Sequence, residues 1–110
     1  MTDKIVVLCT CASTEEGERL ARELVAARVA ACVSVVPGML SVYRWKDAIE
    51  TADECLLLIK SARAQFPELR EAIEKRHSYE VPELLALPVE EGSRNYLDWL
   101  TANLGPAAPE

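Results

Sequence analysis

The sequence lacks the features that mark a secreted, membrane-spanning or nucleic-acid-binding chain. No apolar run approaches the ~20 residues that cross a bilayer, and the opening MTDK lacks the basic start and apolar stretch of a signal peptide. We therefore expect a cytoplasmic protein without membrane insertion. Lys and Arg number 12 against 18 Asp and Glu, and they form no basic stripe. Because phosphate backbones bind to clustered Lys and Arg, nucleic acid and anionic membranes are poor partners.

Aromatic residues and histidine are scarce as well. The chain has one Phe, two Trp, three Tyr and a single histidine, His77. The sequence contains no recognisable Ser-His-Asp arrangement, and a Cys–His pair has no third orienting residue that the sequence identifies. We therefore expect a protein that is not an enzyme. Any function that needs an imidazole near neutral pH must use His77.

The chain has four cysteines, Cys9, Cys11, Cys32 and Cys55, but no C-x-x-C spacing. The absence of this spacing rules out a zinc ribbon and a thioredoxin motif. Without a secretion signal, reduced thiols are the default. Cys32 and Cys55 lie in apolar, strand-like runs and are predicted to be core residues.

The length of 110 residues fits one domain. Half of the residues are apolar, which excludes a disordered chain and allows one hydrophobic core. We expect a single domain over residues 1–110, with its core at 5–104 and a flexible tail at 105–110.

Hydrophobic periodicity predicts alternating strands and helices. Short runs rich in β-branched residues predict strands, and Leu and Ala at spacings of three and four predict amphipathic helices. Ser13 and Glu16 fit a capping box. The strands are expected at 5–9, 32–36 continuing to 45, 49–61 and 83–89, and the helices at 14–29, 64–76 and from Ser93 to Leu104. This order, βαββαβ plus a terminal helix, predicts an α+β, ferredoxin-like fold with two helices on one face of an antiparallel sheet.

The second and third predicted strands are unusually long. Residues 32–45 would span about 46 Å when extended, whereas a compact domain of this length is roughly 34 Å across. A hairpin of these strands would project beyond its own core and expose apolar residues such as Tyr43 and Trp45. Because an uncovered apolar edge aggregates, we expect subunits to associate through the hairpins. In the alternative interpretation, Pro37 and Gly38 end the strand and the remainder folds back as a loop.

A set of short motifs occurs in a characteristic order. They are AACV (30–33), PG (37–38), SVYRW (41–45), IE (49–50), LLIK (57–60), YEVPE (79–83) and YLDWL (96–100). In this order the chain resembles the CutA family, the divalent-cation tolerance proteins, over roughly Ile5 to Leu104. The resemblance implies a ferredoxin-like protomer, a homotrimer built on the long hairpin, and a role in tolerance of copper and other divalent metals, with no established catalytic reaction.

The resemblance also implies a copper site. A cysteine at the end of the first strand matches Cys9, a histidine before the Tyr-x-x-Pro-Glu signature matches His77, and a carboxylate proposed near the metal matches Glu54. Some members have two adjacent histidines where this chain has Arg76 and His77, and the family usually has proline where it has Ser78. The loss of one imidazole implies weaker metal binding than in those relatives.

Cys11 adds a second thiol to this set. Cys9 and Cys11 are two residues apart, so their side chains share a face if the strand includes both. Two thiols and an imidazole suit Cu(I) or Zn(II), although His77 or Glu54 would have to approach in space. In the alternative interpretation, Cys9 is a small buried apolar residue and His77 only interacts with the end of its helix. The neighbours of Cys11 predict that it is exposed.

These observations predict a trimeric cytoplasmic protein that binds copper or another divalent or soft metal with weak to moderate affinity. Two alternatives remain open. A trimeric small-ligand sensor, similar in architecture to the PII signalling proteins, would use Lys60, Arg44 and Arg63 to bind an anion, although no glycine-rich phosphate loop is visible. A structural trimer that anchors a partner is the other alternative.

Overall fold

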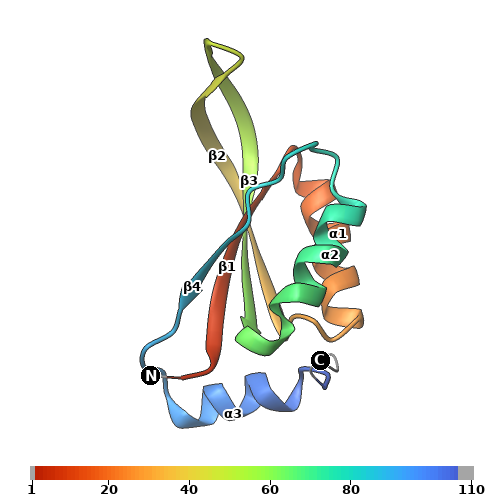
Figure 1. Cartoon of the computed structure of the whole chain (residues 1–110), viewed down its shortest axis with the longest axis vertical. Helices are drawn as coiled ribbons and strands as arrows, with labels where there is room; N and C mark the ends of the chain where they lie inside the picture. The colour runs from red at the N-terminus through yellow and green to blue at the C-terminus, as the bar shows by residue number, and fades with distance from the viewer. Residues whose placement is uncertain (1, 107–110) are drawn as a thin grey trace.

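The computed structural model describes residues 2–106, in which one antiparallel sheet carries two helices on one of its faces (Figure 1). The strands are β1 (Lys4–Cys11), β2 (Cys32–Trp45), β3 (Ala48–Ala62) and β4 (Leu85–Pro88). They pair in the order β2-β3-β1-β4, with every neighbouring pair antiparallel. This topology confirms the ferredoxin-like α+β prediction. Residues 107–110 of the predicted tail lie outside the described residues.

The helices are α1 (Thr14–Ala26), α2 (Phe66–Arg76) and α3 (Arg94–Ala102), and a short 3-10 turn (Arg63–Gln65) precedes α2. Helices α1 and α2 lie side by side against the sheet, and α3 crosses the end of the molecule opposite the hairpin tip (Figure 1). Helix α1 ends before the predicted residue 29, because Arg28 adopts a left-handed φ of 60° that no helix continues.

The N-terminus of α1 is capped only in part as predicted. Ser13 Oγ accepts the Glu16 amide N–H at 3.1 Å, which satisfies one of the free donors of the first turn. The Glu16 carboxylate was expected to return to the cap, but it accepts the backbone N–H of Ser78 at 2.8 Å and its hydroxyl at 2.9 Å. The side chain therefore ties α1 to the segment that follows α2.

The core lies between the sheet and α1 and α2. Alternate residues of β1 and β3 point toward the helices and are buried, as the two-residue period of a strand requires. The side chains that these two strands contribute to the core cluster are Ile5, Val7, Cys9, Cys11, Cys55, Leu57 and Ile59, and those of the helices include Leu20, Leu24, Leu69 and Ile73. Three of the four cysteines thus belong to one sheet face.

The β2–β3 hairpin extends well beyond this core. The two strands stay paired from Cys32 opposite Lys60 to Trp45 opposite Ala48, and the protein is 43 Å long but only 27 × 24 Å across (Figure 1). Between Val36 and Met39 the register shifts at a bulge. Pro37 and Gly38 therefore bend the strand without ending it, so the projecting-hairpin prediction is confirmed and the folded-back loop is wrong.

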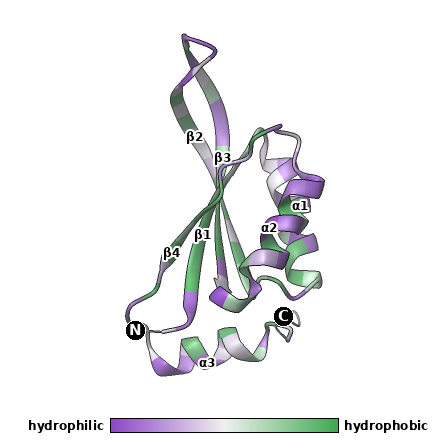
Figure 2. Cartoon of the chain, viewed as in Figure 1, coloured by the Kyte–Doolittle hydropathy of each residue, from purple (hydrophilic) through white to green (hydrophobic). Residues whose placement is uncertain are grey.

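The sheet face opposite α1 and α2 is also apolar, a feature that the local hydrophobic pattern did not predict. Cross-strand partners place Val6, Leu8, Leu56, Leu58, Leu85 and Leu87 on this side. We call this set the open face; Figure 2 shows the apolar colouring along β1 and β4. Leu85 and Leu87 remain 55% and 47% exposed. A contiguous apolar surface of this kind marks an interaction site.

We expect Gly17→Ala to destabilise the protein, because an added Cβ would lie 2.7 Å from Cys55 Sγ. Overpacking costs about 1–3 kcal/mol, which exceeds the ~1 kcal/mol that Ala gains over Gly inside a helix. In a Cys55→Ala background the same change is expected to be neutral or stabilising. Urea unfolding at one fixed protein concentration measures both effects, and equal losses in the two backgrounds would contradict the contact.

Candidate metal centre

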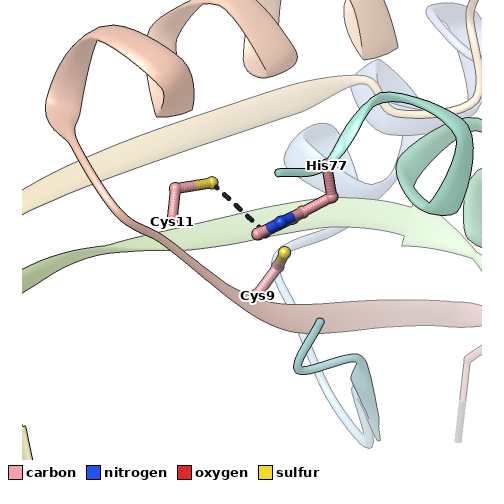
Figure 3. A group of neighbouring side chains, drawn as sticks. All are labelled: Cys9, Cys11 and His77. Atoms are coloured by element: carbon pink, nitrogen blue, oxygen red, sulfur yellow. Dashed lines mark hydrogen bonds between the residues drawn. The ribbon is translucent and has the colours of Figure 1, made fainter. Parts of the chain in front are cut away.

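Two cysteines and the single histidine converge between the sheet and the end of α2. Their ligand atoms, the sulfurs of Cys9 and Cys11 and a ring nitrogen of His77, all lie within 4.8 Å of one another (Figure 3). Both cysteines and the His77 side chain have no exposed surface. We call these residues the Cys–Cys–His group.

The backbone explains this convergence. Strand β1 continues through Cys11, so Cys9 and Cys11 point to the same, helix-covered face. His77 is the C-cap of α2: its N–H donates to Ile73 O at 2.9 Å, and its extended conformation turns the chain back over β1. The predicted exposure of Cys11 is wrong, because the strand runs two residues further than predicted and pairs Cys11 with Cys55.

Hydrogen bonds define the state of the imidazole. His77 Nε2 lies 2.7 Å from the carbonyl oxygen of Thr10, and Nδ1 lies 3.0 Å from the backbone N–H of Tyr79. A carbonyl only accepts and an amide N–H only donates, so we assign the neutral tautomer with its proton on Nε2. Cys11 Sγ is 3.7 Å from the same nitrogen, and the Cys9 thiol also donates to Thr10 O, at 3.8 Å.

The surrounding groups keep the Cys11 thiol protonated. The neighbouring Cys9 thiol raises the pKa of Cys11 most, and burial raises it further. The charges around it, including the Glu16 carboxylate, act in the same direction. Since a metal binds the thiolate, it must displace this proton before Cys11 becomes a ligand.

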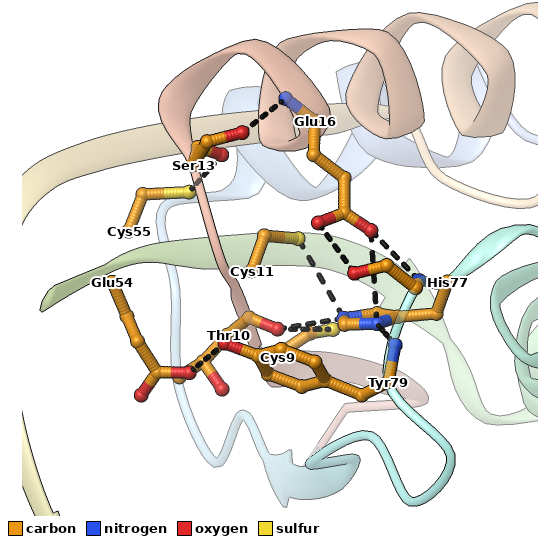
Figure 4. Close-up of polar contacts among 10 residues, drawn as sticks. Cys9, Thr10, Cys11, Ser13, Glu16, Glu54, Cys55, His77 and Tyr79 are labelled. Atoms are coloured by element: carbon orange, nitrogen blue, oxygen red, sulfur yellow. Dashed lines mark hydrogen bonds and ion pairs between the residues drawn. The ribbon is translucent and has the colours of Figure 1, made fainter. Parts of the chain in front are cut away.

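Glu16 secures the segment that carries the histidine. Its carboxylate is almost fully buried and binds both the N–H and the hydroxyl of Ser78 (Figure 4). Burial is the largest single effect and raises the pKa of Glu16, but the hydrogen bonds from Ser78 and smaller contributions from neighbouring groups together lower it more, so its pKa lies below the ordinary value. In the sequence, Glu16 stands out only through the capping-box pattern, and that pattern does not predict its hydrogen bonds to Ser78.

Glu54 does not join the Cys–Cys–His group. Its carboxylate accepts a hydrogen bond from the Tyr79 hydroxyl at 2.5 Å (Figure 4). The Tyr79 ring in turn lies 4.8 Å from the His77 ring, centroid to centroid. Burial, and secondarily Glu54, raises the pKa of Tyr79, so the phenol keeps its proton and donates it. Glu54 therefore contacts the group through Tyr79.

The other two cysteines differ in their surroundings. Cys55 is fully buried, as predicted, and its thiol donates to Ser13 O at 3.3 Å. Cys32 was predicted to be a core residue but is only half-buried. It lies on the opposite side of the sheet, where its partner across the strands is Lys60, whose ammonium is 3.8 Å from the sulfur.

The topology and the buried sulfur–nitrogen group define a small ferredoxin-like protein with a candidate soft-metal centre. Comparison with known proteins identifies the family. The family model described as CutA1 divalent ion tolerance protein matches residues 5–103. The divalent-cation tolerance protein CutA of Thermus thermophilus is 48% identical over 100 residues, 91% of this chain and 97% of that protein. The chain therefore belongs to the CutA1 divalent ion tolerance family.

Solved structures agree with this assignment. The crystal structure of CutA1 from Oryza sativa superposes with a TM-score of 0.93 at 39% identity and covers 94% of this chain and 95% of that one. A CutA from Archaeoglobus fulgidus, described as a periplasmic divalent cation tolerance protein, gives 0.88 at 34% identity, covering 91% and 97%. The family therefore does not fix the compartment. Within residues 2–106, no helix is long and apolar enough to cross a membrane.

We expect Glu16→Ala to lower the free energy of unfolding by about 1–3 kcal/mol, because it removes the charged acceptor of two hydrogen bonds. Glu18→Ala is the matched control on the same helix. Its carboxylate pairs with Arg22 at the surface, where 59% of the Glu18 side chain is exposed, so its loss costs at most about 0.5 kcal/mol. Urea denaturation measures the free energy of unfolding of both variants. Equal losses would contradict the proposed anchoring of the Ser78 segment by Glu16.

Proposed function

We propose that this protein binds soft metal ions, copper above all, through Cys9, Cys11 and His77, and that it acts as a cytoplasmic homotrimer in metal tolerance. The observation that carries the proposal is the convergence of three potential ligand atoms within 4.8 Å, in a chain whose relatives are named for divalent-cation tolerance. The compartment and the trimer rest on the sequence and on the family resemblance.

The chemistry of the donor set fits copper better than the hard divalent ions. Two sulfurs and one imidazole nitrogen favour Cu(I) or Zn(II), whereas magnesium and calcium need several oxygen ligands. Three atoms that are bonded to one such metal at ~2.0–2.3 Å lie about 3.5–4.0 Å apart. The 3.7 Å between Cys11 Sγ and His77 Nε2 already fits, and the widest separation in the Cys–Cys–His group, within 4.8 Å, must contract by up to about 1 Å.

The polar atoms of the Cys–Cys–His group are already paired in hydrogen bonds, which limits the affinity for metal. Ligation through His77 Nε2 requires the loss of its proton and of the bond to Thr10 O. Ligation through Cys11 requires the loss of a firmly held thiol proton. Because all three side chains are buried, the segment after His77 must also open to admit the ion. These costs support weak to moderate binding.

We assign Glu54 a supporting part. Its bond to the Tyr79 hydroxyl holds the phenol ring against His77, and the Tyr79 N–H fixes Nδ1. A partner that orients a ligand in this way typically changes metal affinity without touching the ion. Glu54→Gln keeps an acceptor for the phenol, so it should alter the affinity far less than the loss of a ligand.

The open face and the hairpin support the trimer. Leu85 and Leu87 on the open face are about half exposed, and the hairpin residues Val42 and Ile49 are 64% and 69% exposed. Burial of such side chains gains about 25 cal/mol per Å². Three copies would remove both surfaces from water if the open faces met at the centre and the hairpins lay along their neighbours.

Copper binding is tested by anaerobic Cu(I) titration in the presence of a competing chelator. We expect Cys9→Ser, Cys11→Ser and His77→Ala each to weaken the affinity at least tenfold, since each removes one soft ligand. Cys32→Ser is the control, because Cys32 lies on the other side of the sheet, and Glu54→Gln should stay within about threefold. Unchanged affinity in all three ligand variants would refute the direct metal site and favour the small-ligand sensor.

The assembly is tested by light scattering at micromolar concentration, where we expect a mass three times the 12.2 kDa of one chain. Leu87→Glu should dissociate the trimer, because it places a charge in the proposed buried interface. Val81→Glu is the control, since Val81 is 71% exposed and lies outside the open face. A wild-type protein that runs as a 12.2 kDa monomer would contradict the assembly.

A further inference from the structure

A third buried thiol lies beside the Cys–Cys–His group, and metal ligation does not use it. Cys55 on β3 is the direct cross-strand partner of Cys11 on β1. Neither side chain has any exposed surface, and both face the helices. The apolar core alone does not require sulfur at both positions, since any small apolar side chain would fill the same space.

The strand pairing places Cys11 and Cys55 at a distance that a disulfide can span. Directly opposed residues of an antiparallel pair have Cα atoms about 4.5–5.5 Å apart, and a disulfide joins Cα atoms that are roughly 4.4–6.8 Å apart. Cys9 is a poorer partner, because two residues along one strand separate the Cα atoms by about 6.6 Å.

We propose that Cys11 and Cys55 reduce Cu(II) that reaches the site and form a disulfide with each other. This inference rests on the proposed copper function, with Cu(II) as the substrate and the oxidant. The two thiols release two protons to water and give up two electrons, and one sulfur–sulfur bond forms between them. Two Cu(II) ions each accept one electron and become Cu(I). Cys9 and His77 are not consumed, and they remain as soft ligands for one Cu(I) ion.

The arrangement of the other groups supports this division of roles. Cys9 donates to Thr10 O within its own strand and approaches His77, so it is placed for ligation. Cys55 is bonded to Ser13 O on the far side of Cys11 from the imidazole (Figure 4). Cys32, on the other side of the sheet, cannot reach any of these sulfurs within the chain. One chain therefore stores two electrons in one defined thiol pair.

The experiment starts from fully reduced protein without oxygen or added reductant. Four equivalents of Cu(II) are added, Cu(I) is counted with a chromogenic Cu(I)-specific chelator, and the protein is alkylated, digested and analysed by mass spectrometry. We expect about two Cu(I) ions per chain and a peptide pair linked through Cys11 and Cys55. Cys55→Ser should reduce the rapid Cu(I) yield at least fivefold, and Cys32→Ser should leave it unchanged.

Cys55→Ala repeats the test in case the buried serine hydroxyl prevents folding, and diamide replaces Cu(II) in a parallel sample to test the thiol pairing without metal. An unchanged Cu(I) yield in the Cys55 variants, or a dominant link through Cys9 or Cys32, would overturn the inference. Cu(I) affinity under reducing conditions is measured separately. If wild-type protein binds Cu(I) but forms no Cys11–Cys55 disulfide, only the reduction step is refuted. If wild-type protein does not bind Cu(I), the proposed function on which the inference rests is refuted.

Discussion

The pairing of β1 with β3 is the constraint on which the rest of the structure depends. It runs from Lys4 opposite Ala62 to Cys11 opposite Cys55 without a shift in register. Because strand side chains alternate between faces, this register turns three thiols toward the helices and leaves Val6 and Leu8 on the open face. A slip by one residue would exchange the two sets, so that the thiols would lie on the face of the sheet away from His77. The same ladder thus sets the core, the candidate metal centre and the proposed subunit contact.

The candidate metal centre is closed and internally hydrogen-bonded, and this explains why the proposed binding should be modest. His77 donates to Thr10 O and accepts from the Tyr79 N–H, while Glu16 holds Ser78 next to it. One such hydrogen bond contributes about 0.5–1.5 kcal/mol net. Its loss on ligation therefore weakens binding by up to about tenfold. Proton displacement from the thiols adds to this cost, so the proposed selectivity for soft ions rests on the kind of atoms present and less on a preformed cage.

The order of elements and the long hairpin could be predicted from the sequence, because period-two and helical patterns are local and strong. The convergence of Cys9 with His77 was accessible only through the family resemblance, since the two residues belong to separate elements. The burial of Cys11 was missed because its neighbours are small or polar. Ala12 and Ser13 are exposed, but Cys11 is the last residue of β1 that pairs with β3, and its side chain faces the helices. The Glu16–Ser78 contact and the open face depend on tertiary packing and on register, which no single segment encodes.

X-ray absorption at the copper K-edge of the Cu(I)-loaded protein tests the proposed metal centre most directly. We expect a first coordination shell dominated by sulfur at about 2.3 Å with one nitrogen at about 2.0–2.1 Å, and the loss of the nitrogen in His77→Ala. A shell that contains only oxygen and nitrogen, or one that is unchanged in Cys9→Ser and Cys11→Ser, would contradict a metal centre at the end of β1.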